Sequence, residues 1–213
     1  MSNNTIKCVI FDCDGTLVDS EYLCNLALVQ CLKDCGVEEN PKEMVKRFRG
    51  RKLTQILQSL EAAHHIRFKD NFVPQYRVLV NELFKKELQA CDGVKEVLEN
   101  LSLPMCVASS GPPEKIETAL QVTGLRDYFG ESIFSSYDIN SWKPEPELFL
   151  HAAKEMGFAV NECAVVEDSL VGIQAARAAN MHAILFDPSR YFSSNLATKV
   201  IHDMRELEQS LLV

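Results

Sequence analysis

Apolar residues occur along this chain in short continuous runs, and polar residues follow each run directly. Continuous rather than alternating runs are typical of parallel strands that are covered on both faces. The runs are Lys7–Phe11, Met105–Ala108, Ser132–Phe134, Ala164–Val166 and His182–Phe186. The pattern therefore predicts five buried strands.

Between these runs lie segments with apolar residues at helical spacing. They are Asp92–Leu101, Pro113–Val122, Glu147–Met156 and Ser169–Ala179. Strands that alternate with helices of this length are typical of βαβ units. We therefore predict an α/β fold with a doubly wound parallel sheet.

Residues 16–87 interrupt this alternation, because they contain no convincing strand pattern. Ser20, Asn40, Thr54 and Asp70 are candidate N-caps of successive helices, and Pro41 after Asn40 suits the first turn of one. A strand-to-helix connection normally needs only about 2–6 residues. We therefore predict an α/β catalytic core of residues 1–15 and 88–213, with residues 16–87 inserted after the first strand as a helical cap domain.

The chain of 213 residues has a formal net charge of −8 and an isoelectric point of about 5.2. This charge argues against nucleic acid or an anionic membrane as the main partner, although a small anionic substrate stays possible. No apolar run approaches the roughly 18 residues that span a bilayer, and no secretory signal is visible. The eight cysteines are scattered without a Cys-x-x-Cys pair, which favours reduced thiols. We expect a cytoplasmic monomer.

Chemically active residues follow four of the predicted strands. They are Asp12 and Asp14 after the first strand, Ser109 and Ser110 after the second, Lys143 after the third, and Glu167 and Asp168 at the end of the fourth. Each alone could be a turn residue, a helix cap or a solvated charge. Ligands of such sheets, however, bind at the carboxyl ends of the strands. Crowded carboxylates there raise one another's pKa values unless a cation is present, and oxygen ligands favour Mg²⁺.

These residues, in this order, resemble the motifs of the haloacid dehalogenase (HAD) superfamily, and the resemblance extends over essentially the whole chain. The motifs are Asp12-Cys13-Asp14-Gly15-Thr16, Ser109, Lys143 and Glu167-Asp168. The stretch Phe11–Ser20 is similar to the branch that contains phosphoglycolate phosphatase and β-phosphoglucomutase. The resemblance implies a HAD-like Rossmannoid core with a helical cap, and a phosphatase that acts on a small phosphorylated metabolite.

The resemblance also implies a role for each motif residue. Asp12 would be the nucleophile that forms an aspartyl phosphate, and Asp14 the general acid and base. The phosphoryl group would be bound by Ser109, Ser110, Lys143, Gly15 and Thr16. Magnesium would be held by Asp12, the backbone carbonyl of Asp14, Asp168 and Glu167.

The predicted cap contains a basic cluster around a glycine, namely Arg49, Gly50, Arg51 and Lys52. In an acidic chain such a cluster could bind a second anionic group of the substrate, or it could be a solvated face. The segments Arg47–Gly50, Pro104–Val107 and Trp142–Pro144 resemble a phosphatase of 6-phosphogluconate. This implies a sugar or sugar-acid phosphate such as 6-phosphogluconate as the substrate.

Three alternatives share parts of this pattern. A β-phosphoglucomutase-like phosphomutase has the same core motifs, but the segment Glu21–Leu28 lacks the cap histidine of that group and has Cys24 instead. A true dehalogenase is disfavoured by Asp14 and Thr16. A phospho-accepting signalling receiver has a similar acid site without a cap, so the insert argues against it.

Overall fold

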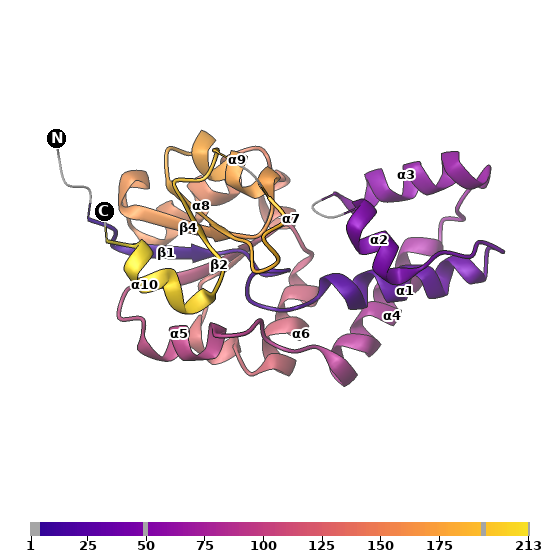
Figure 1. Ribbon diagram of the computed structural model, residues 1–213, viewed down its shortest axis with the longest axis horizontal. Coiled ribbons are helices and arrows are strands. Elements are labelled where there is room, and N and C mark those ends of the chain that lie inside the picture. Colours follow the sequence, from indigo (N-terminus) through magenta and orange to yellow (C-terminus); the bar gives the residue numbers. More distant parts are fainter. Residues whose placement is uncertain (1–4, 49–50, 193–194, 213) are drawn as a thin grey trace. The chain divides into compact units, whose positions relative to one another are not determined.

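The computed structural model describes residues 5–48, 51–192 and 195–212. The chain divides into two compact units. The first consists of Met1–Asp19 and Gln89–Val213, and the second of Ser20–Leu88 (Figure 1). The predicted fold class, an α/β protein with a parallel sheet and an inserted helical segment, is confirmed.

The first unit contains a parallel sheet of six strands in the order β3-β2-β1-β4-β5-β6. The strands are β1 (Cys8–Phe11), β2 (Met105–Ser109), β3 (Ile133–Ser135), β4 (Cys163–Glu167), β5 (His182–Phe186) and β6 (Lys199–Ile201). All five predicted runs form strands with ends shifted by a residue at most. The sequence pattern missed β6, because Lys199 and Val200 are exposed and only Ile201 is buried, so this strand has no continuous apolar run.

Helices cover both faces of this sheet. α8 (Glu147–Met156) packs against β1 and β2, and α9 (Leu170–Ala178) against β4 and β5. α5 (Val94–Asn100) and α6 (Pro113–Thr123) lie on the opposite face (Figure 1). The remaining short helices are α7 (Ser136–Ile139), α10 (Leu207–Ser210) and the 3-10 turns Arg126–Tyr128, Val160–Glu162 and Met204–Glu206.

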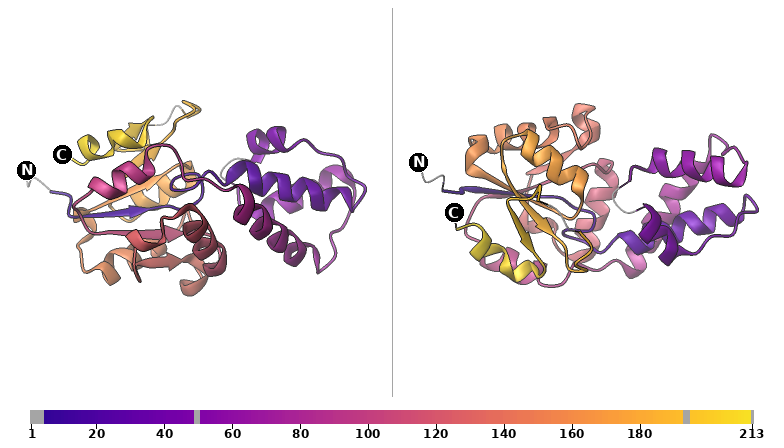
Figure 2. Two further views of the ribbon diagram at one scale, coloured as in Figure 1. Left: turned by 90° about the horizontal axis from the view of Figure 1, so that it is seen from below. Right: turned by 45° about the horizontal axis from the view of Figure 1, so that its top comes forward.

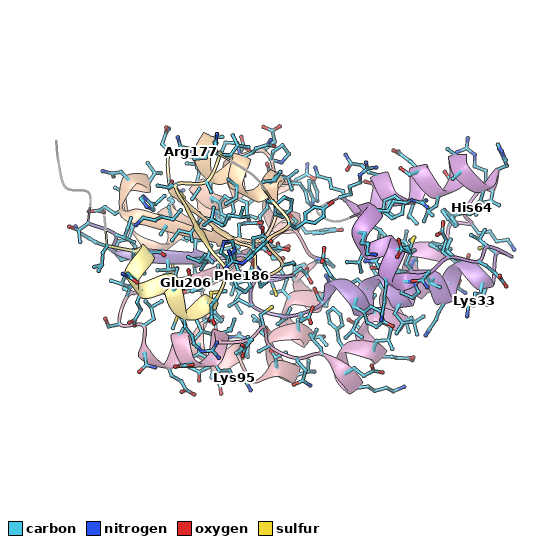
Figure 3. The ribbon with its side chains drawn as sticks, viewed as in Figure 1. Lys33, His64, Lys95, Arg177, Phe186 and Glu206 are labelled. Atoms are coloured by element: carbon cyan, nitrogen blue, oxygen red, sulfur yellow. The ribbon has the colours of Figure 1, made fainter. Side chains whose placement is uncertain are left out.

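The core of the first unit lies between the strands and these helices. α9 illustrates the pattern, because Ile173 and Ala176 are fully buried while Arg177 on its outer side is exposed (Figure 3). Phe186 at the end of β5 is buried as well. All eight cysteines are free thiols.

In its described residues, the second unit consists of helices alone (Figure 2). They are α1 (Glu21–Lys33), α2 (Pro41–Phe48), α3 (Leu53–His64) and α4 (Phe72–Glu87). Leu32, Met44 and Leu60 are completely buried and form the centre of a separate apolar cluster. No helix in the described ranges is long and apolar enough to cross a membrane.

The predicted helix caps had mixed outcomes. Asn40 caps α2, since its Oδ1 accepts hydrogen bonds from the backbone N–H groups of Lys42 at 2.9 Å and Glu43 at 3.3 Å. The predictions for Thr54 and Asp70 are wrong, because α3 begins after Lys52 and α4 after Asn71. Ser20 precedes α1 but makes no capping hydrogen bond with its side chain.

Candidate active site

Three carboxylates gather at the C-terminal ends of the two central strands. Asp12 follows β1, and its backbone N–H donates to the carbonyl of Val166 in β4 at 2.9 Å. Oxygen atoms of Asp12, Glu167 and Asp168 lie within 4.8 Å of one another, and all three residues are buried. The sheet register therefore brings together carboxylate oxygens from two distant parts of the sequence, and this group could hold a metal ion.

Lys143 lies among these carboxylates and is 4% exposed. Its Nζ donates to Oδ1 of Asp12 and, at 2.7 Å, to Oε1 of Glu167. The other oxygen of Glu167 accepts hydrogen bonds from the backbone N–H and the hydroxyl of Ser169, both at 2.7 Å. Ser169 thus fixes Glu167, and Glu167 in turn fixes the ammonium beside Asp12.

Burial and the neighbouring charges have opposite effects on the pKa values of Asp12 and Lys143. Burial raises the pKa of Asp12 to about 7, although the Lys143 ammonium opposes the shift. Burial alone would lower the pKa of Lys143, but the carboxylates of Asp12 and Glu167 outweigh it, so the pKa of Lys143 is raised. A divalent cation at the three carboxylates would favour their ionised forms.

Two glycines lie where a side chain would collide with the carboxylates of Asp168 and Glu167. Gly15 has a φ of +81°, and a Cβ atom built on it would lie 2.2 Å from Oδ2 of Asp168. A Cβ atom on Gly172 would lie 2.0 Å from Oε1 of Glu167. Any larger residue at either position would displace a carboxylate. Sequence reasoning identified Gly15 through its motif but missed Gly172, which stands in the first turn of α9.

The carboxylate of Asp14 is held separately from these three. Lys115 in the first turn of α6 donates to both of its oxygens, at 2.7 Å to Oδ1 and 2.6 Å to Oδ2. Both side chains are partly buried, with 21% and 31% of their surfaces exposed. Sequence reasoning missed Lys115 as well. A lysine at the N-terminal end of a helix was the available signal, because the helix dipole disfavours a cation there.

Apart from Lys143, which follows β3, the predicted phosphate-binding residues lie at the end of β2 or in the turns that follow β1 and β2. Ser109 is buried, and its Oγ accepts a hydrogen bond from the backbone N–H of Gly111 at 3.1 Å. Ser110 follows it and is partly exposed. Thr16 is completely buried, and its hydroxyl has no hydrogen-bond partner among the described residues.

The basic cluster of the second unit is described only in part. Arg49 and Gly50 lie outside the described residues. Arg51 is exposed and its guanidinium stands 5.9 Å from the ring centroid of Phe48. Lys52 is exposed and immediately precedes α3.

The fold and the site define a class of protein: a doubly wound α/β enzyme with acidic residues at the carboxyl ends of its central strands and a helical insert after the first strand. The chain belongs to the haloacid dehalogenase-like hydrolase family, whose model matches residues 9–186. The predicted resemblance to the HAD superfamily is therefore confirmed, and with it the enzyme class, a HAD-like phosphatase.

Individual relatives agree with this assignment. The chain is 40% identical to 6-phosphogluconate phosphatase of Escherichia coli K12, over 85% of this chain and 82% of that protein. It is 29% identical to fructose-1-phosphate phosphatase YqaB of the same organism, over 83% and 94% of the two chains. A crystal structure of a haloacid dehalogenase-like protein from Agrobacterium tumefaciens is 31% identical, with a TM-score of 0.84 over 97% of both chains.

Proposed function

We propose that this protein is a magnesium-dependent phosphatase that hydrolyses a small sugar or sugar-acid phosphate through an aspartyl phosphate on Asp12. The observation that carries the proposal is the buried carboxylate cluster of Asp12, Glu167 and Asp168 with the ammonium of Lys143 inside it. A nucleophilic carboxylate needs such compensation to approach an anionic phosphoryl group.

In the first step, an oxygen of the Asp12 carboxylate attacks phosphorus in line with the ester oxygen. The new P–O bond to Asp12 forms as the bond to the sugar oxygen breaks, and Asp14 donates the proton that the leaving alcohol needs. Lys143 offsets negative charge on the transferring group. Ser109, Ser110 and the backbone N–H groups of the Gly15–Thr16 turn are the proposed hydrogen-bond donors to its oxygens.

In the second step, Asp14 accepts a proton from water while the water oxygen attacks phosphorus. The bond between phosphorus and Asp12 breaks, and its electron pair returns to the Asp12 carboxylate. Inorganic phosphate leaves and the nucleophile is regenerated. The two aspartates need different surroundings for these two roles. The Asp12 side chain is 8% exposed beside Lys143, whereas the Asp14 side chain is 31% exposed and is bound by Lys115.

The residues at the cluster suit magnesium. Carboxylate and carbonyl oxygens are its preferred protein ligands, and Gly15 and Gly172 leave space that a Cβ atom would fill. Asp12, Asp168, the carbonyl of Asp14 and Glu167, directly or through water, would hold the ion. When bound, it would supply positive charge to the phosphoryl oxygens.

The substrate assignment is supported by the relative named 6-phosphogluconate phosphatase, at 40% identity. We propose 6-phosphogluconate as the first candidate. We further propose that residues 16–87 act as a cap that excludes water and selects the leaving group. Arg51 and Lys52, with Arg49 outside the described residues, would recognise a second anionic group. The enzyme would act as a cytoplasmic monomer without nucleic acid or membrane as a partner.

The test is a phosphate-release assay on a panel of sugar and sugar-acid phosphates with Mg²⁺. We expect release of inorganic phosphate from 6-phosphogluconate, faster than from glucose 6-phosphate, whose carbon 1 is an uncharged cyclic hemiacetal in place of the carboxylate. Conversion of a sugar phosphate into its isomer without phosphate release would contradict hydrolysis and support the phosphomutase alternative. Activity on no member of the panel would contradict the substrate class.

A further inference from the structure

Lys115 donates hydrogen bonds to Asp14 from a helix position where a lysine is not expected to stabilise the fold. Lys115 is the third residue of α6, which begins at Pro113. Positive charge is unfavourable in the first turn of a helix, because the N-terminal end of the helix dipole is itself positive. A solvent-facing lysine would also lose less side-chain entropy than one held in place. Lys115 is instead 21% exposed and makes two short hydrogen bonds to one carboxylate.

We propose that Lys115 is the positioning residue of Asp14 in the hydrolysis of the aspartyl phosphate. The inference rests on the proposed function, in which Asp14 takes a proton from the attacking water. Two hydrogen bonds from a single Nζ fix both carboxylate oxygens, so they fix the direction in which the remaining lone pairs of Asp14 point. Its carboxylate is thereby kept apart from Asp12, whose own partner is Lys143.

The surrounding loop supports the same arrangement. A Cβ atom on Gly111 would lie 3.7 Å from Oδ2 of Asp14, so the turn after β2 passes close to this carboxylate. That turn is itself fixed, because Ser135 donates from its hydroxyl to the carbonyl of Gly111 at 2.6 Å. Lys115 thus lies on a helix whose start is anchored to β3, and it transmits that fixed position to Asp14.

Lys115 acts through Asp14, so its loss should affect the second chemical step more than the first. With p-nitrophenyl phosphate, phosphorylation of Asp12 needs little help from an acid, because nitrophenolate is a stable leaving group. Hydrolysis of the phosphoenzyme still needs Asp14 as a base. A base contributes about 10²- to 10⁴-fold in rate, and a small misplacement can lose about 10²-fold.

The experiment compares the full-length wild type with K115M, K115R and D14N, and with K154M as a matched control at an exposed lysine of α8. Rapid mixing with p-nitrophenyl phosphate resolves the burst of nitrophenol from the steady state, and acid quenching measures the phosphoenzyme. For K115M we expect a burst rate within about threefold of wild type, and a steady-state rate about 10- to 100-fold lower. The phosphoenzyme should approach one equivalent per active site.

The other variants separate the possible explanations. K115R keeps the charge and can bind both oxygens, so it should recover much of the steady-state rate, while K154M should match wild type. The inference is wrong if K115M resembles wild type, if its burst and steady-state rates fall together, or if only its KM for a sugar-acid phosphate rises. The proposed function itself is wrong if D14N turns over like wild type, so the two failures are distinguishable. Circular dichroism and thermal unfolding show whether K115M is folded.

Discussion

Gly172 offers a sharp test of how the site is built. A Cβ atom at this position would lie 2.0 Å from Oε1 and Cδ of Glu167 and 2.5 Å from Cγ. These distances are far below van der Waals contact, so the substitution G172A must displace the Glu167 side chain. That side chain is 2% exposed and is held by Lys143 and Ser169 at 2.7 Å, so it cannot move without losing these bonds.

The expected cost follows from these contacts. Breaking a buried ion pair costs about 3–5 kcal/mol, and alanine in place of glycine in a helix offsets at most about 1 kcal/mol of this. We therefore expect G172A to lose about 2–4 kcal/mol of unfolding free energy. We also expect most of its phosphatase activity to be lost, because Lys143 and the carboxylate cluster shift with Glu167.

Urea unfolding followed by far-ultraviolet circular dichroism measures the stability, and a double-mutant cycle with E167A isolates the cause. When Glu167 is shortened to alanine the clash disappears. Adding G172A in that background should then be neutral, or stabilising by up to about 1 kcal/mol through helix propensity. An equal loss in both backgrounds would refute the steric reasoning, as would a G172A protein as stable as wild type.

Three further predictions concern the chemistry. D12N removes the nucleophile while keeping its shape, so it should abolish phosphate release without loss of folded structure by circular dichroism; activity within about tenfold of wild type would exclude the covalent mechanism. Removal of divalent metal with EDTA should abolish turnover and added Mg²⁺ should restore it, whereas full activity in metal-free buffer would contradict the proposed ligand set. Alanine at Arg49, Arg51 or Lys52 should lower kcat/KM for a sugar-acid phosphate by about 10- to 150-fold at the residue that binds its second anion, because a charged hydrogen bond contributes about 1.5–3 kcal/mol. The same variants should change activity on p-nitrophenyl phosphate much less, and equal losses on both substrates would assign the cluster to a solvated face.

Local patterns of apolar and polar residues in the sequence predicted much of the fold. Continuous apolar runs predicted β1 to β5, because burial on both faces leaves no polar position in a central strand. The missing strand pattern in residues 16–87 indicated the helical segment. The sequence pattern could not predict β6, because two of its three residues are exposed and the strand forms by pairing with β5. The predictions of caps at Thr54 and Asp70 were wrong because several neighbouring polar residues are possible N-caps at each of these helix starts.

The site divides in the same way. The sequence by itself determined which chemical groups stand at the ends of β1, β2 and β4, since a carboxylate that directly follows a parallel strand must lie at that edge. Only the tertiary structure decided how their charges are paired. Asp14 is paired with Lys115, which lies on a helix distant in the chain. The side chain of Glu167, at the end of β4, occupies space left by Gly172 in the helix that follows. Such contacts depend on the distances between side chains in the folded protein, which no periodicity or spacing along the sequence specifies.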